Sequence, residues 1–169
     1  MVSKTSRESL KEADVVNRRE ERMEVDMIQI KENQLDVQTY LSLREKVNWK
    51  KISEEQARKA LENSLITICA FQEEQPVGMA RMVGDGAVIC YVQDLIIIPE
   101  VQGQGIGSML LEYMKGYAQS LIEPGTQMML DLMCAKGRES FYEKHGFIAR
   151  PTENLGPGMI CYLKGKQEG

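Results

Sequence analysis

The sequence predicts a single α/β domain, and three observations support this prediction. Segments with strand-like and helix-like hydrophobic patterns alternate along most of the chain. A buried-looking strand runs through a proline and a glycine-spaced turn into a long amphipathic helix. The chain has 169 residues, of which 43% are hydrophobic, and this is enough to bury one core without disulfides or metal.

The predicted strands show period-two alternation or short apolar runs. The segment 88–98 is the long central strand, whose apolar run at 95–98 suits burial on both faces. Glu73 and Glu74 form the tip of a hairpin, and the GDG run at 84–86 forms the next turn. The predicted strands are 27–31, 65–71, 75–83, 88–98, 126–134, 148–150 and 159–163.

Four helices are predicted from hydrophobic spacing and from end signals. The clearest starts after Gly105, where apolar residues recur at helical spacing as far as Leu121. Ser53 and Gln56 form a capping box that opens another helix, and Gly146 ends a short one. The predicted helices are 35–47, 53–64, 106–121 and 139–144, and residues 151–158 form a loop.

The turn before the long helix has the sequence QGQGIG, with Gly103, Gly105 and Gly107 on alternate positions. Its backbone can approach a ligand without Cβ atoms in the way, and the positive end of the helix dipole favours phosphate. Two common phosphate loops do not fit. Gly107 is followed by Ser108 without the lysine of a Walker loop, and GxGxG replaces the GxGxxG of a dinucleotide fingerprint. A tight turn without a ligand is the alternative.

The turn resembles the acetyl-CoA loop of the GNAT family of N-acetyltransferases, whose pattern Q/R-x-x-G-x-G/A is matched by Gln102, Gly105 and Gly107. A second segment, FYEKHGF at 141–147, resembles the family's late helix and following strand. The resemblance covers about residues 27–163. It implies a mixed, mostly antiparallel sheet, splayed at its centre, with helices on both faces. It also implies direct transfer of an acetyl group to an amine, with acetyl-CoA as co-substrate and no metal.

The resemblance also implies which residues hold acetyl-CoA. Backbone N–H groups of residues 102–108 bind the pyrophosphate, and a bulge in the central strand frees N–H groups at Leu95 and Ile97 to polarise the thioester carbonyl. An asparagine common in the family is Ala135 here, so its segment holds the pantetheine by backbone alone or less firmly. The implied donor-binding residues are Leu95, Ile96, Ile97, Gln102, Gly103, Gln104, Gly105, Ile106, Gly107, Ser108, Ala135 and Tyr142.

Tyr142 matches the tyrosine that protonates the departing thiolate in many GNAT enzymes. Its ordinary pKa of about 10 lies close to the roughly 8.5 of a thiol, which permits useful proton donation. The alternative is that its ring is only part of the core. His145, the single histidine, lies at the end of the same predicted helix, where a structural role with the helix dipole is expected.

The acceptor side is less well defined. If Leu95 marks the bulge, strand alternation turns Gln93 and Tyr91 toward the acceptor, where either orders a water that relays the amine proton. Asp131, on the neighbouring strand, is a second candidate, and no residue is assigned as the base. Trp49 lies between the first two helices, which flank the acceptor pocket in this family, either as a wall of that pocket or as simple packing.

Composition and hydrophobic patterning limit the expected partners and location of the protein. The formal charge is −4 with mixed signs and no basic patch, which argues against nucleic acid as a partner. No apolar run approaches the ~20 residues of a membrane span and no signal-peptide core is seen, so a cytoplasmic location is expected. The scattered cysteines are expected as reduced core thiols, and no metal-ligand cluster is seen.

Residues 1–26 are expected to form a charged extension, and residues 27–169 the catalytic domain. The extension is a solvated tail, an arm on a neighbouring subunit of a homodimer, or the product of a misassigned start codon. The predicted acceptor is a small amine (arylalkylamine, polyamine or amino sugar) or, less favoured, a protein amine. Two rivals are a non-catalytic acetyl-CoA sensor and a dimer-forming structural domain with an empty groove.

Overall fold

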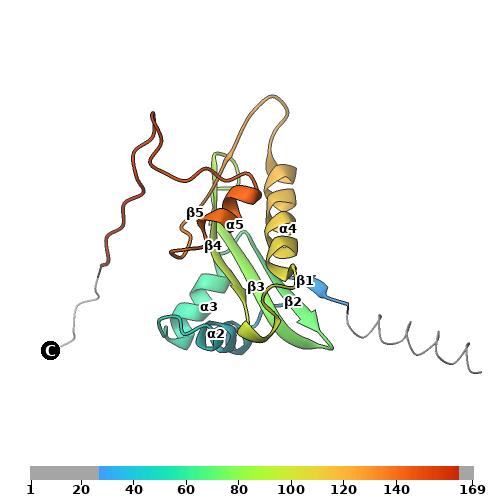
Figure 1. The fold of residues 1–169 in the computed structure, drawn as a ribbon. Coiled ribbons are helices and arrows are strands. Elements are labelled where there is room, and N and C mark those ends of the chain that lie inside the picture. The colour runs from blue at the N-terminus through green and yellow to red at the C-terminus, as the bar shows by residue number, and fades with distance from the viewer. Residues whose placement is uncertain (1–26, 164–169) are drawn as a thin grey trace, which may run out of the picture. The chain divides into compact units, whose positions relative to one another are not determined.

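The computed structural model of the protein describes residues 27–163, in which strands and helices follow one another (Figure 1). The chain divides between Asp131 and Leu132 into two compact units. The elements are β1 (Gln29–Glu32), α2 (Val37–Lys46), α3 (Glu54–Glu62), β2 (Ile66–Gln72), β3 (Gln75–Gly84), β4 (Ile89–Ile97), the 3-10 helix η1 (Pro99–Val101), α4 (Ile106–Leu121), β5 (Met129–Leu132) and α5 (Glu139–Lys144).

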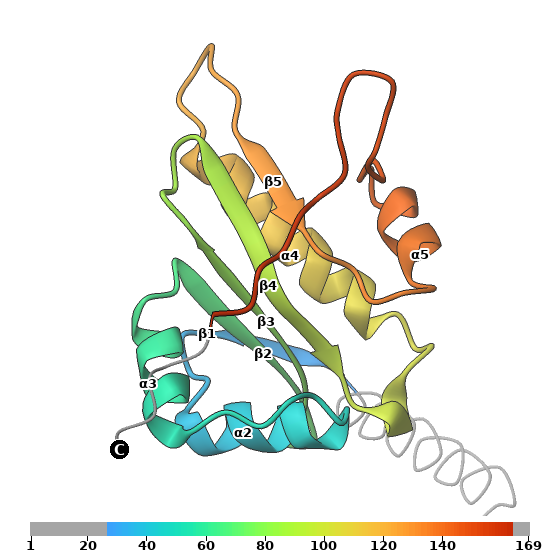
Figure 2. The ribbon, with the colours of Figure 1, turned by 90° about the vertical axis from the view of Figure 1, so that its left-hand side faces the viewer.

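The five strands form one sheet in the order β1-β2-β3-β4-β5 (Figure 2). Strands β1 to β4 pair antiparallel in succession, and Glu73 and Glu74 turn the β2–β3 hairpin with φ angles of 47° and 62°. The chain then passes through α4 and returns as β5, which runs in the same direction as β4 (Figure 2). The sheet is therefore mixed and mostly antiparallel, and the predicted fold class is confirmed.

Helices α2 and α3 cover one face of the sheet, and α4 covers the other (Figure 1). Arg81 of β3 reaches the carbonyl of Ala60 in α3, whereas a Cβ at Gly78, three residues earlier on β3, would contact Leu110 of α4. Residues three apart on a strand point to opposite faces, which agrees with these contacts. The residues that α4 buries against the sheet are Ile106, Leu110, Leu111, Met114 and Ala118.

The helix starts follow the sequence signals. The Asp36 side chain accepts from the N–H of Thr39 over 2.8 Å and caps α2, and this backbone hydrogen bond lowers the pKa of the carboxyl. The predicted capping box is confirmed, because Ser53 and Gln56 each accept from the other's backbone N–H at the start of α3. Both caps fix where the helices on this face begin.

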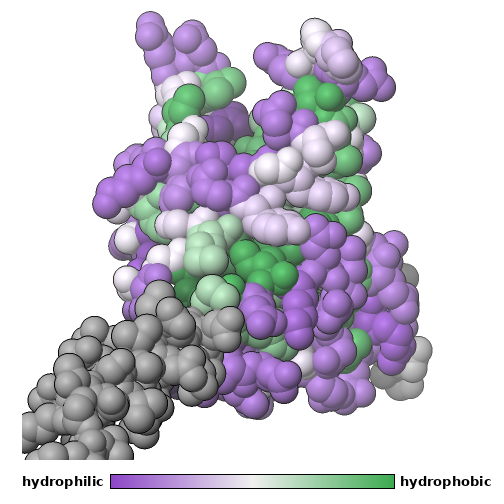
Figure 3. All heavy atoms as spheres, turned by 90° about the vertical axis from the view of Figure 1, so that its right-hand side faces the viewer, coloured by the Kyte–Doolittle hydropathy of each residue, from purple (hydrophilic) through white to green (hydrophobic). Residues whose placement is uncertain are grey.

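The surface on the α4 side is mostly hydrophilic, with apolar side chains gathered near its centre (Figure 3). Two large side chains of α4, Met109 and Tyr113, are 43% and 37% exposed. The hydroxyl of Tyr113 donates to the carboxylate of Glu32 at the end of β1, which raises the pKa of Tyr113. The helical spacing places Met109 and Tyr113 on the apolar face of α4, but the structure leaves both side chains partly exposed at its edge.

Two predicted strands near the C-terminus are wrong. Residues 148–150 and 159–163 form no strand, and the strand predicted at 126–134 is limited to Met129–Leu132. These predictions rested on apolar runs of a few residues, which do not by themselves provide a ladder partner. Cys161 lies in the last of these segments and is exposed, so its predicted place in the core is also wrong, whereas Cys69 and Cys90 are buried.

Replacing Gly78 with alanine is expected to lower the free energy of unfolding by about 1–3 kcal/mol. Gly78 pairs with Ile97, and an added Cβ would lie 2.8 Å from the backbone oxygen of Ile96 and 2.6 Å from the Ile97 side chain. The β3–β4 pair would have to separate locally. Urea unfolding measures the effect, and a stability equal to that of the unmodified protein would contradict the close approach.

Candidate active site

Two glycines in the left-handed conformation shape the loop between β4 and α4. Gly103 has a φ of 82° and Gly105 a φ of 87°, a region that other residues rarely adopt. A Cβ atom at either position would meet no protein atom within 4 Å. Backbone conformation, and not crowding, therefore demands glycine here, and the space beside the backbone is open.

The N-terminus of α4 directs positive charge toward this loop. Gly105 is the N-cap, no side chain caps the helix, and the first turn of its 16 residues holds no acidic residue. The first four N–H groups of a helix have no acceptor within it, and the macrodipole adds about half a positive charge at this end. The arrangement suits a bound anion such as a pyrophosphate.

Gln102 ties this loop to the end of β4. Its side-chain amide donates to the carbonyl of Ile97 over 2.8 Å, and its backbone N–H donates to the carbonyl of Pro99 over 3.3 Å. The first contact satisfies a carbonyl at the strand end. Gln102 therefore has a structural role, because its contacts fix the position of the glycine loop relative to the end of β4.

A β-bulge interrupts β4 at Gln93. Arg81 of β3 pairs with Asp94, whereas the next residue of β3, Met82, pairs with Val92, so that Gln93 is left without a partner in the register. A bulge of this kind places two residues of one strand opposite one residue of its neighbour. The central strand thus carries a bulge, two residues before Leu95.

The bulge determines where the following N–H groups point. Ile98 donates to a carbonyl of β3 over 2.9 Å, and alternate residues of a strand direct their N–H groups to opposite edges. The N–H groups of Leu95 and Ile97 therefore point away from β3. Before the bulge, the even-numbered residues direct their backbone groups to the edge away from β3. Val88 shows this, since its carbonyl accepts from the N–H of Met129 in β5 over 3.0 Å. The inserted residue moves Leu95 and Ile97 onto this edge.

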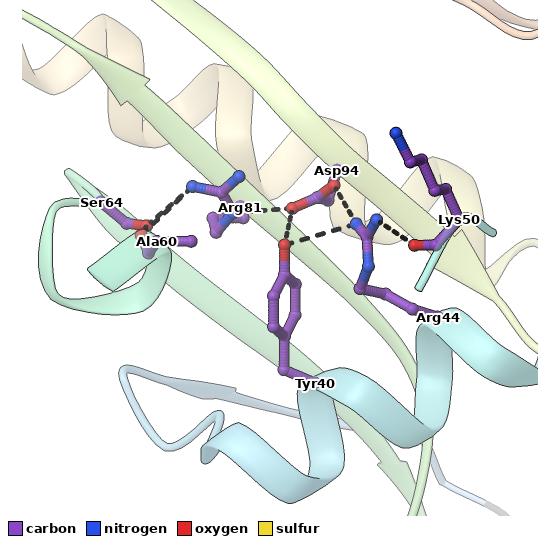
Figure 4. Close-up of polar contacts among 7 residues, drawn as sticks. All are labelled: Tyr40, Arg44, Lys50, Ala60, Ser64, Arg81 and Asp94. Carbon is purple, nitrogen blue, oxygen red and sulfur yellow. Dashed lines mark hydrogen bonds and ion pairs between the residues drawn. The ribbon is translucent and has the colours of Figure 1, made fainter. Parts of the chain in front are cut away.

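Asp94 lies at the centre of a buried polar cluster (Figure 4). Its side chain is 1% exposed and accepts from the Tyr40 hydroxyl over 2.8 Å, from Nε of Arg81 over 2.7 Å and from Nη1 of Arg44 over 3.3 Å. These four residues, named here the Asp94 cluster, come from α2, β3 and β4. One carboxylate thus balances two guanidinium groups inside the protein.

The two arginines connect the Asp94 cluster to the helices on this face. Nη1 of Arg81 donates to the carbonyl of Ala60 and to the hydroxyl of Ser64, over 3.2 and 3.3 Å. Nη2 of Arg44 donates to the carbonyl of Lys50 over 3.1 Å (Figure 4). The cluster therefore holds β3 and β4 against α2, α3 and the segment that joins the two helices.

Burial makes the Asp94 cluster sensitive to the loss of any member. Removing one partner of a buried ion pair costs about 3–5 kcal/mol, because the other charge stays uncompensated. Burial, and then the charge of Asp94, raises the pKa of Tyr40, so its hydroxyl stays protonated and donating. The sequence analysis missed Tyr40, Arg44 and Arg81. The one available signal was Arg81, a charged residue within the apolar GMARMV run.

Three residues predicted on the acceptor side lie in or next to β4 and α2. Trp49 is half-buried, and the guanidinium of Arg44 lies 5.1 Å from its ring centroid. Tyr91 pairs with Val83, two residues from Arg81 on β3, so it shares the face that bears the Asp94 cluster. Gln93 is exposed at the bulge. The structure thus gathers Trp49 and Tyr91 on the face covered by α2 and α3.

Asp131, the other predicted candidate for removing the amine proton, is half-buried on β5. It is the last residue of the first compact unit, which also contains the loop 102–108 and the bulge. Ala135 and Tyr142 belong to the second unit, and Ala135 is exposed there.

Tyr142 lies on α5 among other aromatic rings. Its ring centroid is 5.0 Å from that of Phe141 and 5.9 Å from that of Phe147, both edge to face. Burial raises the pKa of its hydroxyl above the ordinary 10.0, Cys134 raises it further, and Arg138 opposes the change. The hydroxyl is therefore protonated at neutral pH and can donate.

His145 and Gly146 end the helix that carries Tyr142. His145 is the C-cap and its ring lies 5.0 Å from that of Phe141, which agrees with the expected structural role. Gly146 follows with a φ of 87°, as a glycine at a helix end does. Within residues 27–163, no group of three metal-ligating side chains is found, and no helix is long and apolar enough to cross a membrane.

Comparison with known proteins identifies the family. The family profile described as "Acetyltransferase (GNAT) domain" matches residues 63–149. A protein of Prochlorococcus marinus named as an uncharacterized ycf52-like N-acetyltransferase is 30% identical over 124 residues, which are 71% of this chain and 67% of that protein. The chain belongs to the GNAT family of acetyltransferases. Within that family it is an N-acetyltransferase, the activity for which its relatives are named.

Solved structures agree with this assignment. A GNAT-family acetyltransferase from Streptococcus pneumoniae is 31% identical with a TM-score of 0.70. The match covers 82% of this chain and 100% of the other chain. A probable acetyltransferase of unknown function from methicillin-resistant Staphylococcus aureus is 26% identical with a TM-score of 0.71, covering 81% and 100%. These likenesses confirm the predicted GNAT fold.

Proposed function

We propose that this N-acetyltransferase moves an acetyl group directly from acetyl-CoA to the primary amine of a small molecule, such as an arylalkylamine, a polyamine or an amino sugar. The observation that carries the proposal is the arrangement of one continuous stretch. The bulge at Gln93 turns the Leu95 and Ile97 N–H groups to the edge away from β3, and the left-handed glycines follow at the positive end of α4.

The donor side uses backbone groups. The loop at 102–108 and the start of α4 hold the pyrophosphate, and the Leu95 N–H donates to the thioester oxygen as negative charge develops on it. The amine nitrogen forms a bond to the carbonyl carbon, and the carbon–sulfur bond breaks. Tyr142 gives its proton to the thiolate that leaves, and its raised pKa keeps that proton available.

The acceptor side must remove a proton from the amine. An amine with a pKa of about 10 is neutral in roughly one molecule per thousand at pH 7, which is equivalent to about 4 kcal/mol. Gln93 and Tyr91 are proposed to order a water that relays this proton, with Asp131 as the other candidate. Trp49 is proposed as a wall of the acceptor pocket. The acidic overall charge favours a cationic acceptor.

A panel of primary amines tests this function. Thiol release from acetyl-CoA is measured with arylalkylamines, polyamines, amino sugars and peptides, and turnover with at least one small amine is expected. Calorimetry with acetyl-CoA alone is the matched measurement of donor binding. Tight donor binding with no thiol release from any acceptor would contradict the proposal and favour the acetyl-CoA sensor. The cytoplasmic location and the homodimer remain predictions from the sequence.

A further inference from the structure

We infer that Asp94 is a positioning residue, which selects the bulged register of β4 and thereby aims the Leu95 N–H at the thioester. The inference rests on the proposed function, because Leu95 has this role only when acetyl-CoA occupies the loop. Asp94 touches neither substrate. It acts through the backbone of the residue that follows it in the chain.

The bulge places the Asp94 side chain and the Leu95 N–H together. In the observed register Asp94 pairs with Arg81, and its carboxylate faces α2 and α3. Without the bulge, regular pairing would continue from the Met82–Val92 pair, and Asp94 would lie opposite Ala80. A shift of one residue turns every side chain to the other face, so the Asp94 carboxylate would then face α4.

The same shift would change the direction of the backbone groups. In the register without the bulge, Leu95 would lie opposite Met79, whose backbone groups bond to β4 in the observed ladder. The Leu95 N–H would then be used within the β3–β4 pair. The bulged register alone leaves this N–H on the edge away from β3, where a thioester oxygen can accept from it.

The two faces of the sheet differ in what they offer a carboxylate. The face covered by α4 is apolar, with Ala80, Leu110 and Met114 each 0% exposed. A carboxylate there would have no partner, and an unpaired buried charge is strongly unfavourable. The opposite face supplies a hydroxyl and two guanidinium groups to Asp94 and would leave those two cations uncompensated without it. The Asp94 cluster thus opposes loss of the bulge.

The contacts of Asp94 also separate it from the general base. Its Oδ2 accepts from Tyr40 and Arg81, its Oδ1 accepts from Arg44, and its side chain is 1% exposed. A general base has to reach the proton that it removes, directly or through one water. Asp94 instead stabilises the bulged register of β4.

The test uses the full chain with Asp94→Asn, and with Tyr40→Phe as a milder change that removes one donor and keeps all charges. Ile68→Ala is the matched control, because Ile68 is 0% exposed on β2 and lies outside the Asp94 cluster. For each variant, thermal unfolding, the acetyl-CoA dissociation constant, kcat across pH and backbone amide NMR spectra are measured.

We expect Asp94→Asn to lower kcat at least ~10-fold at every pH, since misplacement by about 1 Å can cost 10²-fold. The acetyl-CoA dissociation constant, set by the loop, is expected to change less than ~3-fold. Acetyl-CoA is expected to shift the Leu95 amide in the unmodified protein and in Ile68→Ala but not in Asp94→Asn, while the amides of Gly103 and Gly105 shift in all three. Tyr40→Phe is expected to give an intermediate kcat.

Three results would each overturn the inference. The first is that the Gln93 and Leu95 amides of free Asp94→Asn match those of the unmodified protein. The second is a loss of kcat that only follows thermal stability, as in Ile68→Ala. The third is loss of the acidic limb of the pH profile alone, which would make Asp94 the base. If the unmodified protein neither binds acetyl-CoA nor releases thiol, the proposed function fails, and the spectra of the free variants still decide the role of Asp94 in the bulge.

Discussion

Replacing Gly105 with valine is expected to weaken acetyl-CoA binding by at least ~30-fold. Gly105 has a φ of 87° at the N-cap of α4, and a β-branched residue in this region is strained by about 2 kcal/mol, which equals ~30-fold in affinity. The strain is expected to turn the N–H groups of the first helical turn away from the pyrophosphate. Calorimetric titration with acetyl-CoA measures the loss.

Two further variants separate backbone conformation from bulk. Gly105→Asn adds a side chain that tolerates the left-handed region, so it is expected to retain more affinity than valine. Gly116→Ala changes a glycine inside α4 where a Cβ meets nothing within 4 Å, so it is expected to leave binding unchanged and stabilise the helix by about 0.5–1 kcal/mol. Equal binding by Gly105→Val and the unmodified protein would exclude the loop as the pyrophosphate site.

The sequence predicted the β4–α4 stretch well because its signals are local. Within a few positions, a run of β-branched residues indicates the strand, a proline indicates its end, and alternate glycines indicate the loop. The helical spacing from Ile106 to Leu121 then gives α4 with its observed bounds. Capping at Ser53 is local in the same way. Such features depend on neighbours in the chain and not on the fold.

The Asp94 cluster could not be predicted, because its members are distant in the chain. Tyr40 and Asp94 are separated by 54 positions, and the contact forms only when α2 lies across β3 and β4. Strand alternation without a bulge would place Asp94 on the face opposite to Tyr91. The register of a strand with a bulge depends on its partner, and the inserted Gln93 reverses the face of each residue that follows.

The predicted strands at 148–150 and 159–163 failed for a related reason. A short apolar run is compatible with several structures, and a strand exists only where a neighbour offers backbone partners. Pro151 and Pro157 lie beside these runs and lack an N–H, while Met159 and Leu163 are 89% and 92% exposed. Hydrophobicity alone does not show that a residue is buried.

Replacing Tyr142 with phenylalanine is expected to lower kcat at least ~10-fold with the acetyl-CoA dissociation constant nearly unchanged. The change removes one hydroxyl and keeps the ring, so the edge-to-face contacts with Phe141 and Phe147 remain. Only proton donation to the departing thiolate is lost, and such donation contributes typically 10²–10⁴-fold. Steady-state kinetics with calorimetry measures both quantities, because a step made only in the transition state lowers kcat and not affinity.

The pH dependence of the unmodified enzyme gives the same role an independent test. A proton donor works while it is protonated, and burial raises the pKa of Tyr142 above 10.0. Ionisation of Tyr142 therefore should not reduce kcat appreciably between pH 7 and about pH 9, and an alkaline decline is expected only above that range. A matched control is Phe147→Leu, which loosens the aromatic contact but keeps the hydroxyl. If Phe147→Leu and Tyr142→Phe lowered kcat equally, packing of the ring and not its proton would be the contribution of Tyr142.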